Sequence, residues 1–271
     1  MRERASDGIR WLESERLERA GVRAGWTLRA GGASTPPYDS LNLGLHVGDE
    51  SATVLENRER AARALGLPAA DCVYAEQVHG GKLAAVASAE RGRGARSHAD
   101  AMPGADALLT GEPGLPLVVL SADCLLLALA VPGENGAIAA VHASWRSTAA
   151  GIVEGAARAL AGRAGAHPGE IVAALGPCLG PCCYEVREDM RAAFLSARGT
   201  GAGRFFEARE GRTFFHLERA VRAQLDSALL ARENVESVGR CTACAAEEFF
   251  SHRRDRGRTG RGALVVLRRG R

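Results

Sequence analysis

The chain has 271 residues, of which 46% are hydrophobic and 25% are charged, and its formal net charge at pH 7 is +3. This length supports a large buried core, and the small net charge gives no reason to expect nucleic acid or an anionic membrane surface as a partner. Because no apolar run approaches the roughly 18 residues of a spanning helix and no signal peptide precedes the first elements, we expect a cytoplasmic protein without a membrane segment.

The first elements surround a turn-rich segment. Residues 1–20 are rich in Arg and Glu and predict a charged N-terminal extension, either frayed or a short helix, ahead of one domain at residues 21–271. A strand is predicted from Trp26 to Arg29, and the alternation from Leu41 to Leu45 predicts a second strand returning to the same sheet. Asn42 within it is either a turn-stabilising side chain or a substrate contact.

The next stretch predicts a helix followed by short strands. Apolar residues from Ser51 to Leu65 lie at spacings that fit one helix face. Arg58 within this helix is either a solvated arginine or a ligand contact. Strands are predicted at residues 71–77 and 83–87, and the first of them leads to His79.

Two apolar runs in the middle of the chain predict strands whose ends carry polar residues. The run at residues 115–121 is followed by Asp123 and Cys124, and the run at residues 137–142 ends at His142. Arg146 follows, before a predicted helix at residues 147–160. Since strand ends are where loops gather side chains into clefts, we expect both ends to face one pocket.

His79, Cys124 and His142 are the candidate ligands of that pocket. Two imidazoles and a thiolate form a three-ligand set that suits zinc and leaves a fourth position for water or substrate. Taken singly, each residue has another interpretation: a lone Cys after a strand is often a small buried hydrophobe, and a lone His often has a backbone partner. The nearby Asp123 and Arg146 favour a shared site, because a core would exclude such polar groups.

Seven cysteines without a secretion signal favour reduced thiols over a disulfide framework. Cys182 and Cys183 are adjacent in a segment dense in turn residues, and Cys241 and Cys244 have the spacing of metal or redox motifs. One CxxC without a matching second pair is a weak signal for a zinc ribbon. The sequence therefore favours structural loop cysteines at all four positions.

The C-terminal part predicts a strand at residues 170–175, helices at 188–197 and 213–230, and a final strand at 263–267. Arg253 and Arg254 lie in the loop before that last strand. Arginines clustered on such a loop bind phosphate or carboxylate through their planar guanidinium groups, or else form a solvated face. The first interpretation requires the loop to return to the His/Cys pocket.

Together these motifs resemble the YfiH-like laccase-domain family. The resemblance rests on motifs that occur in the same order along nearly the whole chain: Gly-Gly-Ala-Ser, Ser-Leu-Asn-Leu-Gly, Glu-Asn-Arg, Gln-Val-His-Gly, Ala-Asp-Ala-Leu-Leu-Thr, Ala-Asp-Cys, Val-His-Ala-Ser-Trp-Arg, Gly-Pro-Cys-Cys-Tyr-Glu-Val and Phe-Phe-Ser-His-Arg-Arg-Asp. It implies a single α/β domain, an α-β-β-α sandwich of mixed sheets flanked by helices, with His79, Cys124 and His142 as metal ligands.

The resemblance also implies an activity. The family was first described as polyphenol oxidases and is now regarded as purine nucleoside enzymes, which phosphorolyse adenosine, inosine, guanosine and methylthioadenosine and deaminate adenosine. We therefore expect small-molecule nucleosides and phosphate as partners, zinc as the metal with copper as an alternative, and a monomer or a weak homodimer. Asp123 is the candidate proton shuttle, and Asn42, Arg58, Arg146, Arg253 and Arg254 are the candidate substrate and phosphate contacts.

This sequence departs from the family pattern near its centre. Ser144 and Ser147 stand where the family commonly has Gly, and His252 stands where it often has Tyr. A serine needs room for its side chain, and a positive φ would be costly for it. We expect the metal ligands to be unaffected, whereas the fit of substrate near Trp145 depends on how these serines are accommodated.

Two other activities stay open at this point. A copper-dependent polyphenol oxidase of the multicopper type needs about ten His ligands, usually with His-x-His pairs. This chain has seven His and no such pair, so a self-contained multicopper centre is hard to build, although copper can still occupy a His/Cys/His site. The other alternative is a Cys/His hydrolase with Cys124 as nucleophile and His142 as base.

Overall fold

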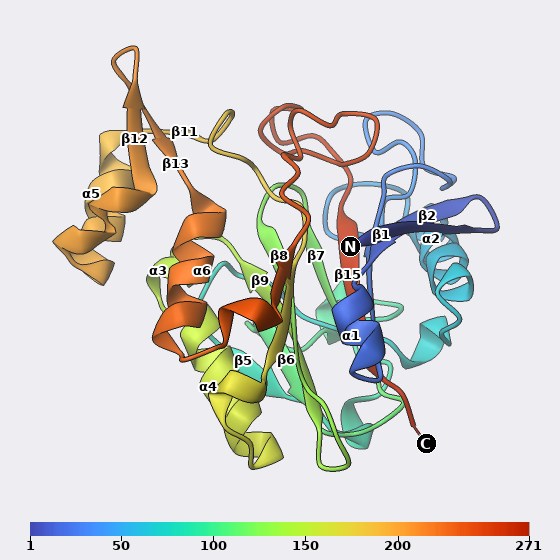
Figure 1. Ribbon diagram of the computed structural model, residues 1–271. Helices are drawn as coiled ribbons and strands as arrows, with labels where there is room; N and C mark the ends of the chain where they lie inside the picture. The colour runs from blue at the N-terminus through green and yellow to red at the C-terminus, as the bar shows by residue number, and fades with distance from the viewer. Residues whose placement is uncertain (271) are drawn as a thin grey trace.

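The computed structural model describes residues 1–270 and consists of two six-stranded mixed sheets stacked face to face, with helices on both outer faces (Figure 1). This is the predicted α-β-β-α sandwich, and the fold class is confirmed. No helix within residues 1–270 is long and apolar enough to cross a membrane.

The first sheet has the strand order β1-β2-β3-β15-β7-β4 and contains both ends of the described chain. Its strands are β1 (Arg2–Ser6), β2 (Ile9–Glu13), β3 (Val22–Thr27), β4 (Val73–Tyr74), β7 (Leu117–Ser121) and β15 (Gly262–Arg268). Helices α1 (Glu15–Arg19) and α2 (Ser51–Ala64) belong to this half of the molecule.

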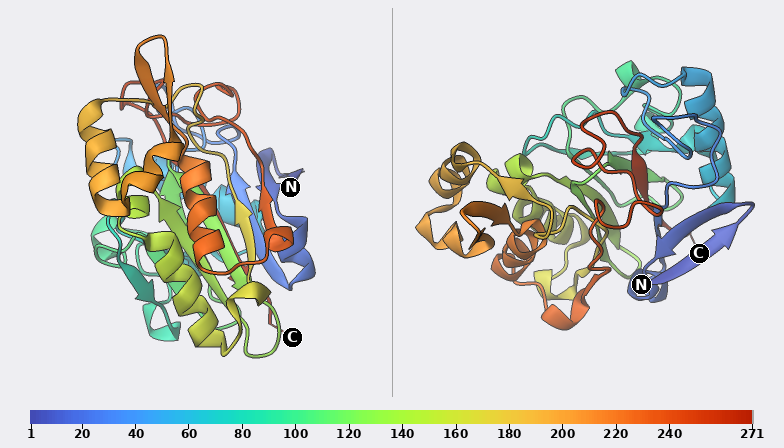
Figure 2. Two further views of the ribbon diagram at one scale, coloured as in Figure 1. Left: turned by 60° about the vertical axis from the view of Figure 1, so that its left-hand side comes forward. Right: turned by 90° about the horizontal axis from the view of Figure 1, so that it is seen from above.

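The second sheet has the order β14-β10-β8-β9-β6-β5. Its strands are β5 (Leu83–Ala85), β6 (Ala107–Thr110), β8 (Leu125–Val131), β9 (Ala137–Ala143), β10 (Val172–Leu175) and β14 (Val235–Ser237). The helices on this side are α3 (Trp145–Ala149), α4 (Ile152–Ala164), α5 (Glu188–Arg198) and α6 (Leu217–Ser227), and Figure 2 shows α4 and α6 lying along the outer face of the sheet.

A third, three-stranded sheet extends beyond the sandwich in the order β11-β13-β12. It comprises β11 (Glu185–Val186), β12 (Phe206–Arg209) and β13 (Arg212–Phe215). Short 3₁₀ helices at Ala69–Asp71, Ser88–Glu90, His98–Asp100, Pro168–Glu170, Thr200–Phe205 and Arg232–Asn234 complete the assigned helices of the described chain.

Three hydrophobic clusters correspond to the spaces between the four layers. Along β8 and β9, the odd-numbered residues pack against the helices, whereas the even-numbered residues from Leu126 to Ala130 and from Ile138 to Ala140 pack between the sheets. The remaining cluster joins α2 to the first sheet. Strands buried on both faces read as continuous apolar runs, and this pattern is the basis of the predicted strands at β7 and β9. The sequence analysis did not predict β8, which lies between them in the chain.

Trp26 and Gly176 show how closely the two sheets approach each other. The Trp26 indole Nε1 donates to the Leu126 carbonyl at 3.0 Å, which satisfies a buried polar group across the interface. A Cβ atom at position 176 would lie 2.1 Å from that nitrogen. Only glycine therefore fits at this point of the chain.

The N-terminal residues differ from the sequence-based expectation of a frayed segment or a short helix. Strands β1 and β2 form an antiparallel hairpin that pairs with β3, and Trp11 and Leu12 are buried. The helical prediction is right only for α1. The hairpin was not recognised because β1 has no buried residue and carries three charged side chains, which form ion pairs such as Arg4–Glu13 at 3.0 Å.

Two further predictions are wrong in part. The alternation at residues 41–45 does not form a strand: Leu41 and Leu43 are buried, but Asn42 directs its side chain to the backbone of Gly44 and closes a turn. The predicted helix at residues 213–230 begins only at Leu217, because residues 212–215 form β13. The predicted helix at 147–160 is divided by Gly151, whose φ of 81° ends α3.

Candidate metal centre and cleft

Strand register brings Cys124 and His142 together. Leu126 pairs with His142 across β8 and β9, so Cys124, two residues before Leu126, is on the same face and diagonal to the imidazole. This is the face that packs between the two sheets, and His142 extends the row of Ile138 and Ala140 to the end of the sandwich. The two strand ends therefore meet at one site, as predicted.

Asp106 fixes both histidines and was missed in the sequence analysis. It lies just before β6 with its side chain fully buried, and its Oδ1 is 2.8 Å from His142 Nδ1. The same carboxylate accepts the backbone N–H groups of Val78, His79 and Gly80 at 3.2, 3.0 and 2.7 Å. These bonds hold the His79 loop, where His79 has a φ of 61°, against β9.

The three predicted ligands fit a metal ion. The ligand atoms of His79, Cys124 and His142 all lie within 4.8 Å of one another. The two imidazole rings pack edge to face with centroids 5.0 Å apart. Because Asp106 occupies Nδ1 of His142, Nε2 is the nitrogen that a metal ion would bind, as in the carboxylate–histidine–metal arrangement that is common in protein metal sites.

The same proximity shifts the acidities of the groups when metal is absent. Burial raises the pKa of Cys124, but the imidazoles of His142 and His79 outweigh it and bring the pKa to about 7, below the usual 9.0. Burial lowers the pKa of His142, but Cys124 and Asp106 outweigh it and raise the pKa to about 9. The metal-free site thus favours a thiolate, the form that binds metal.

A cleft of about 360 Å³ opens beside the three ligands. This volume lies within the roughly 300–1,000 Å³ typical of small-molecule sites. Its lining combines histidines, aromatic residues and arginines: His46, Gln77, His79, His98, Asp123, Cys124, His142, Ser144, Trp145, Arg146, Tyr184, His252, Arg253 and Arg261, with Ala75, Leu120, Ser121, Ala122 and Leu179. The loops at the end of the sandwich that holds the site gather at the top of Figure 1.

Of the predicted anion contacts, Arg146 and Arg253 line the cleft. The Arg146 guanidinium stacks on Trp145 at 4.4 Å and has no hydrogen bond or ion pair to any described residue. Arg253 Nη1 donates to the Cys183 and Glu185 carbonyls at 3.3 and 2.8 Å. Neither guanidinium is neutralised by a carboxylate within the described chain, so both are available to an anionic ligand.

The other predicted contacts lie outside the cleft lining, and their polar groups bind protein. Arg58 is buried, donates to three carbonyls including that of Leu43, and stacks on Tyr74 at 3.8 Å. Arg254 forms a two-pronged ion pair with Asp255. Asn42 is buried, and its Oδ1 accepts from the backbone N–H groups of Gly44 and Arg261. The turn-stabilising interpretation of Asn42 therefore describes its observed contacts.

Asp123 lies in the crossover from β7 to β8 with a φ of 95°. Its Oδ1 accepts the Thr242 hydroxyl and its Oδ2 accepts the backbone N–H of Arg253, both at 2.6 Å. A non-glycine residue persists in this backbone region only when its surroundings hold it there. Asp123 is also the one carboxylate among the described residues that line the cleft.

The two serines that depart from the family pattern are accommodated without strain. Ser144 has a φ of −79° and caps α3, accepting the N–H of Ser147. Ser147 returns the interaction by accepting the N–H of Ser144 at 2.7 Å. Both hydroxyls are buried and mutually bonded, so each serine satisfies its own polar group. His252 lines the cleft at the place where the family often has Tyr.

Several cleft residues were not singled out from the sequence. His46, His98, Tyr184 and Arg261 come from four segments far apart in the sequence, and no local pattern relates them. Asp106 stands just before an apolar run, but its partners His142 and the backbone of residues 78–80 are distant in the sequence, so no local pattern indicates its role.

Comparison with known proteins shows which family the chain belongs to. The model of the family described as multi-copper polyphenol oxidoreductase laccase matches residues 23–269. The purine nucleoside phosphorylase YlmD of Geobacillus stearothermophilus is 39% identical over 262 residues, which cover 96% of this chain and 94% of that protein. The purine nucleoside phosphorylase YfiH of Escherichia coli is 36% identical over 91% of this chain and 93% of its own length.

Solved structures share the fold. The crystal structure of YlmD from Geobacillus stearothermophilus superposes with a TM-score of 0.91 at 36% identity and covers 98% of each chain. The crystal structure of YfiH from Bacillus licheniformis gives 0.90 at 32% identity, again over 98% of each chain. This protein belongs to the multi-copper polyphenol oxidoreductase laccase family, together with the YfiH and YlmD proteins.

Proposed function

We propose that this protein is a purine nucleoside phosphorylase that acts on adenosine, inosine, guanosine and methylthioadenosine, that it also deaminates adenosine, and that zinc binds at its His/Cys/His site. One observation carries the proposal: a single cleft combines three metal ligands with arginines that lack acidic partners. The names of the relatives YlmD and YfiH as purine nucleoside phosphorylases support it.

Arg146 and Arg253 are the groups we assign to phosphate. Phosphorolysis needs a phosphate oxygen to attack C1′ of the ribose while the C1′–N9 bond to the purine breaks. A guanidinium holds such an anion through two parallel N–H···O bonds. Arg146 is the stronger candidate, because its N–H groups have no acceptor among the described residues and Trp145 orients its plane.

Trp145 and Tyr184 offer the cleft's aromatic surface for the purine, because flat rings pack well against aromatic side chains. The departing base must take up a proton. His98 and His252 line the same cleft, and imidazole is a common side chain for proton transfer near neutral pH. His46 lines it too, but burial and the nearby Arg261 lower its pKa to about 4, so its ring is neutral near pH 7. We assign the proton donor to His98 or His252.

The donor set of His79, Cys124 and His142 suits zinc, with Asp106 fixing the tautomer of His142. When bound there, zinc supplies Lewis acidity, which lowers the pKa of coordinated water to about 7 and provides the chemistry that hydrolytic deamination requires. Asp123 is the carboxylate we assign to proton transfer in that reaction, since it is next to Cys124 and lines the cleft.

A Cys/His hydrolase is the second candidate, favoured by the low pKa of Cys124 beside His142. It predicts activity that persists after chelation and is lost on alkylation. A multicopper phenol oxidase is disfavoured, because its copper centre needs a cluster of histidines. The described residues form only one His/Cys/His group and one all-cysteine group that could hold a metal ion.

The decisive assay offers adenosine, inosine, guanosine and methylthioadenosine to the purified protein, with and without phosphate, and separates free base from deaminated product. Cys124→Ala is expected to abolish turnover. Cys72→Ala, which removes a buried thiol outside the site, is the matched control and is expected to retain it. Activity that survives in Cys124→Ala, or silence of the wild type on all four nucleosides, would overturn the proposal.

A further inference from the structure

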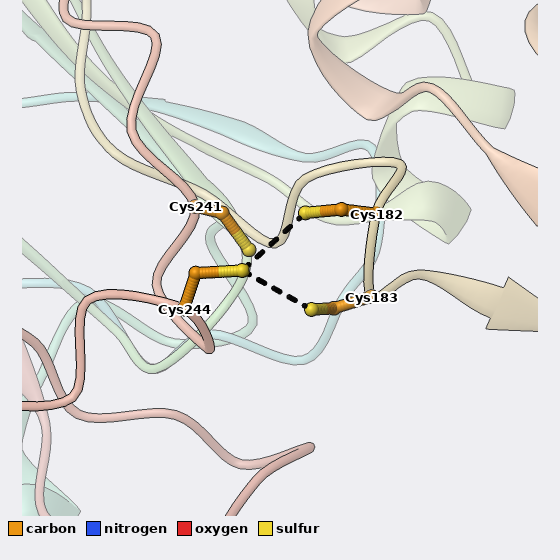
Figure 3. A group of neighbouring side chains, drawn as sticks. All are labelled: Cys182, Cys183, Cys241 and Cys244. Atoms are coloured by element: carbon orange, nitrogen blue, oxygen red, sulfur yellow. Dashed lines mark hydrogen bonds between the residues drawn. The ribbon is translucent and has the colours of Figure 1, made fainter.

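Four cysteines outside the cleft converge at one point. Figure 3 shows Cys182 and Cys183 from one loop facing Cys241 and Cys244 from another. The four sulfur atoms all lie within 4.8 Å of one another, and Cys244 Sγ is 3.5 Å from both Cys182 Sγ and Cys183 Sγ. The CxxC therefore has the matching second pair that the sequence analysis did not identify, because its partners are adjacent cysteines 58 residues earlier in the chain.

These distances suit a tetrahedral metal site. A zinc–thiolate bond of about 2.3 Å places the four sulfurs of a tetrahedral complex about 3.8 Å apart. In the cluster two sulfur pairs are 3.5 Å apart and no pair exceeds 4.8 Å, so small shifts would reach this value. All four thiols are free, and a disulfide would need its sulfurs at about 2.05 Å.

The surrounding backbone holds the cluster in place. The backbone N–H of Gly180 donates to Cys241 Sγ at 3.2 Å, which would stabilise a thiolate there. A Cβ atom at position 180 would lie 3.0 Å from Cys241 Cβ and 3.2 Å from Cys182 Sγ, so glycine permits the close approach. Cys178 and Cys241 also pair as an isolated parallel bridge, which joins the two loops directly.

We propose that Cys182, Cys183, Cys241 and Cys244 bind a structural Zn²⁺ ion, separate from the metal at the His/Cys/His site. Four thiolates fill a tetrahedral shell and leave no position for substrate, which is the arrangement of a structural rather than a catalytic zinc. Two of the cysteines are exposed and two are partly buried, so the ion can reach the site from solvent.

The ion would link two loops that contribute residues to the cleft or position them. The loop of Cys183 continues into Tyr184, and the Arg253 guanidinium donates to the Cys183 carbonyl. The loop of Cys241 carries Thr242, whose hydroxyl donates to Asp123. Loss of the zinc is therefore expected to loosen this wall of the cleft while leaving His79, Cys124 and His142 in place.

The test uses the Cys124→Ala protein, which lacks a ligand of the other metal site, expressed in zinc-supplemented medium and purified under reducing conditions. Metal analysis is expected to find one zinc per chain, which Cys244→Ser or Cys182→Ser then removes and Cys72→Ser does not. After exchange for Co²⁺, the Cys124→Ala protein should show the sulfur-to-cobalt charge-transfer bands of a tetrathiolate, and this readout needs no change at the cluster.

Three results would overturn the proposal. The first is a Cys124→Ala protein that keeps no zinc and gives a Co²⁺ spectrum without charge-transfer bands. The second is a zinc content that both Cys244→Ser and Cys182→Ser leave unchanged. The third combines two findings: mass spectrometry after non-reducing purification shows these four cysteines in disulfides, and the protein still binds no zinc after reductant and zinc are added. None of these readouts depends on nucleoside turnover, so they are independent of the proposed activity.

Discussion

The substitution Asp106→Asn replaces one carboxylate oxygen by an NH₂ group and removes one negative charge. Although small, it changes the side chain that positions both His79 and His142. Oδ1 of the carboxylate accepts hydrogen bonds from the His142 ring at Nδ1 and from the backbone N–H of His79. Oδ2 accepts the backbone N–H groups of Val78 and Gly80. An asparagine side chain has one acceptor oxygen, and its NH₂ group only donates. Whichever way the amide is oriented, two of the four N–H groups lose their acceptor.

The expected cost follows from that count. A buried donor left without an acceptor costs about 1–3 kcal/mol, so two of them lower the free energy of unfolding by roughly 2–6 kcal/mol. This is a large share of the roughly 5–15 kcal/mol that stabilises a typical domain. Because Asp106 also orients a metal ligand, zinc affinity is expected to fall by about 10- to 100-fold.

The pH dependence has a definite sign. Burial raises the pKa of Asp106, but the hydrogen bonds from His142 and from the backbone N–H groups outweigh it, so the pKa lies below the ordinary 3.8. A carboxyl group whose folded-state pKa is lowered stabilises the fold above its ordinary pKa and loses that contribution as the pH falls through the folded-state value. The stability difference between wild type and Asp106→Asn should therefore narrow below about pH 3.8.

The assay is denaturant unfolding of both proteins, metal-free and zinc-loaded, together with competition against a chelator of known affinity. Asp100→Asn is the matched control: its side chain is 66% exposed and lies 4.0 Å from Arg93, so its effect should stay within about 0.5 kcal/mol. Equal stability and equal zinc affinity in Asp106→Asn and wild type would refute the role assigned to this carboxylate.

Three further predictions concern the cleft and the core. In metal-free protein, alkylation of Cys124, followed by peptide mass spectrometry, should rise with a midpoint near pH 7; a midpoint near 9 would contradict the electrostatics of the site. Arg146→Ala should raise the KM for phosphate roughly 10- to 100-fold, which corresponds to the loss of a charge-assisted hydrogen bond of about 1.5–3 kcal/mol. Arg158→Ala, which removes an exposed arginine, is the control and should leave the KM for phosphate unchanged. Gly176→Ala should lower the free energy of unfolding by about 1–3 kcal/mol through overpacking. The control Gly155→Ala, where an added Cβ meets nothing within 4 Å, should not destabilise the protein. Equal denaturation midpoints for the two variants would refute the packing argument.

The sequence was most informative where the structure depends on local pattern. The apolar runs of β7 and β9 predicted two buried strands, with Cys124 and His142 at the ends of those runs. In the structure, the register of β8 with β9 is what brings the two side chains together. The resemblance to a known family supplied the layer order, which periodicity alone does not determine. Both the fold class and the family are confirmed.

The sequence was least informative where a role depends on distant partners. Arg58 and Arg254 look the same as Arg146 in sequence, yet Arg58 binds buried carbonyls and Arg254 binds Asp255. The convergence of the cysteine pairs likewise requires two loops to come together. These features depend on long-range packing, and no window of the chain encodes them.

The measurement that tests the central proposal most directly is a mass balance for inosine turnover. With phosphate present, ³¹P NMR should detect ribose 1-phosphate in one-to-one ratio with released hypoxanthine, and both should vanish in Cys124→Ala but not in Cys72→Ala. Hypoxanthine released with free ribose in place of the sugar phosphate would show hydrolysis instead, and would contradict the assignment of Arg146 and Arg253 to a phosphate substrate.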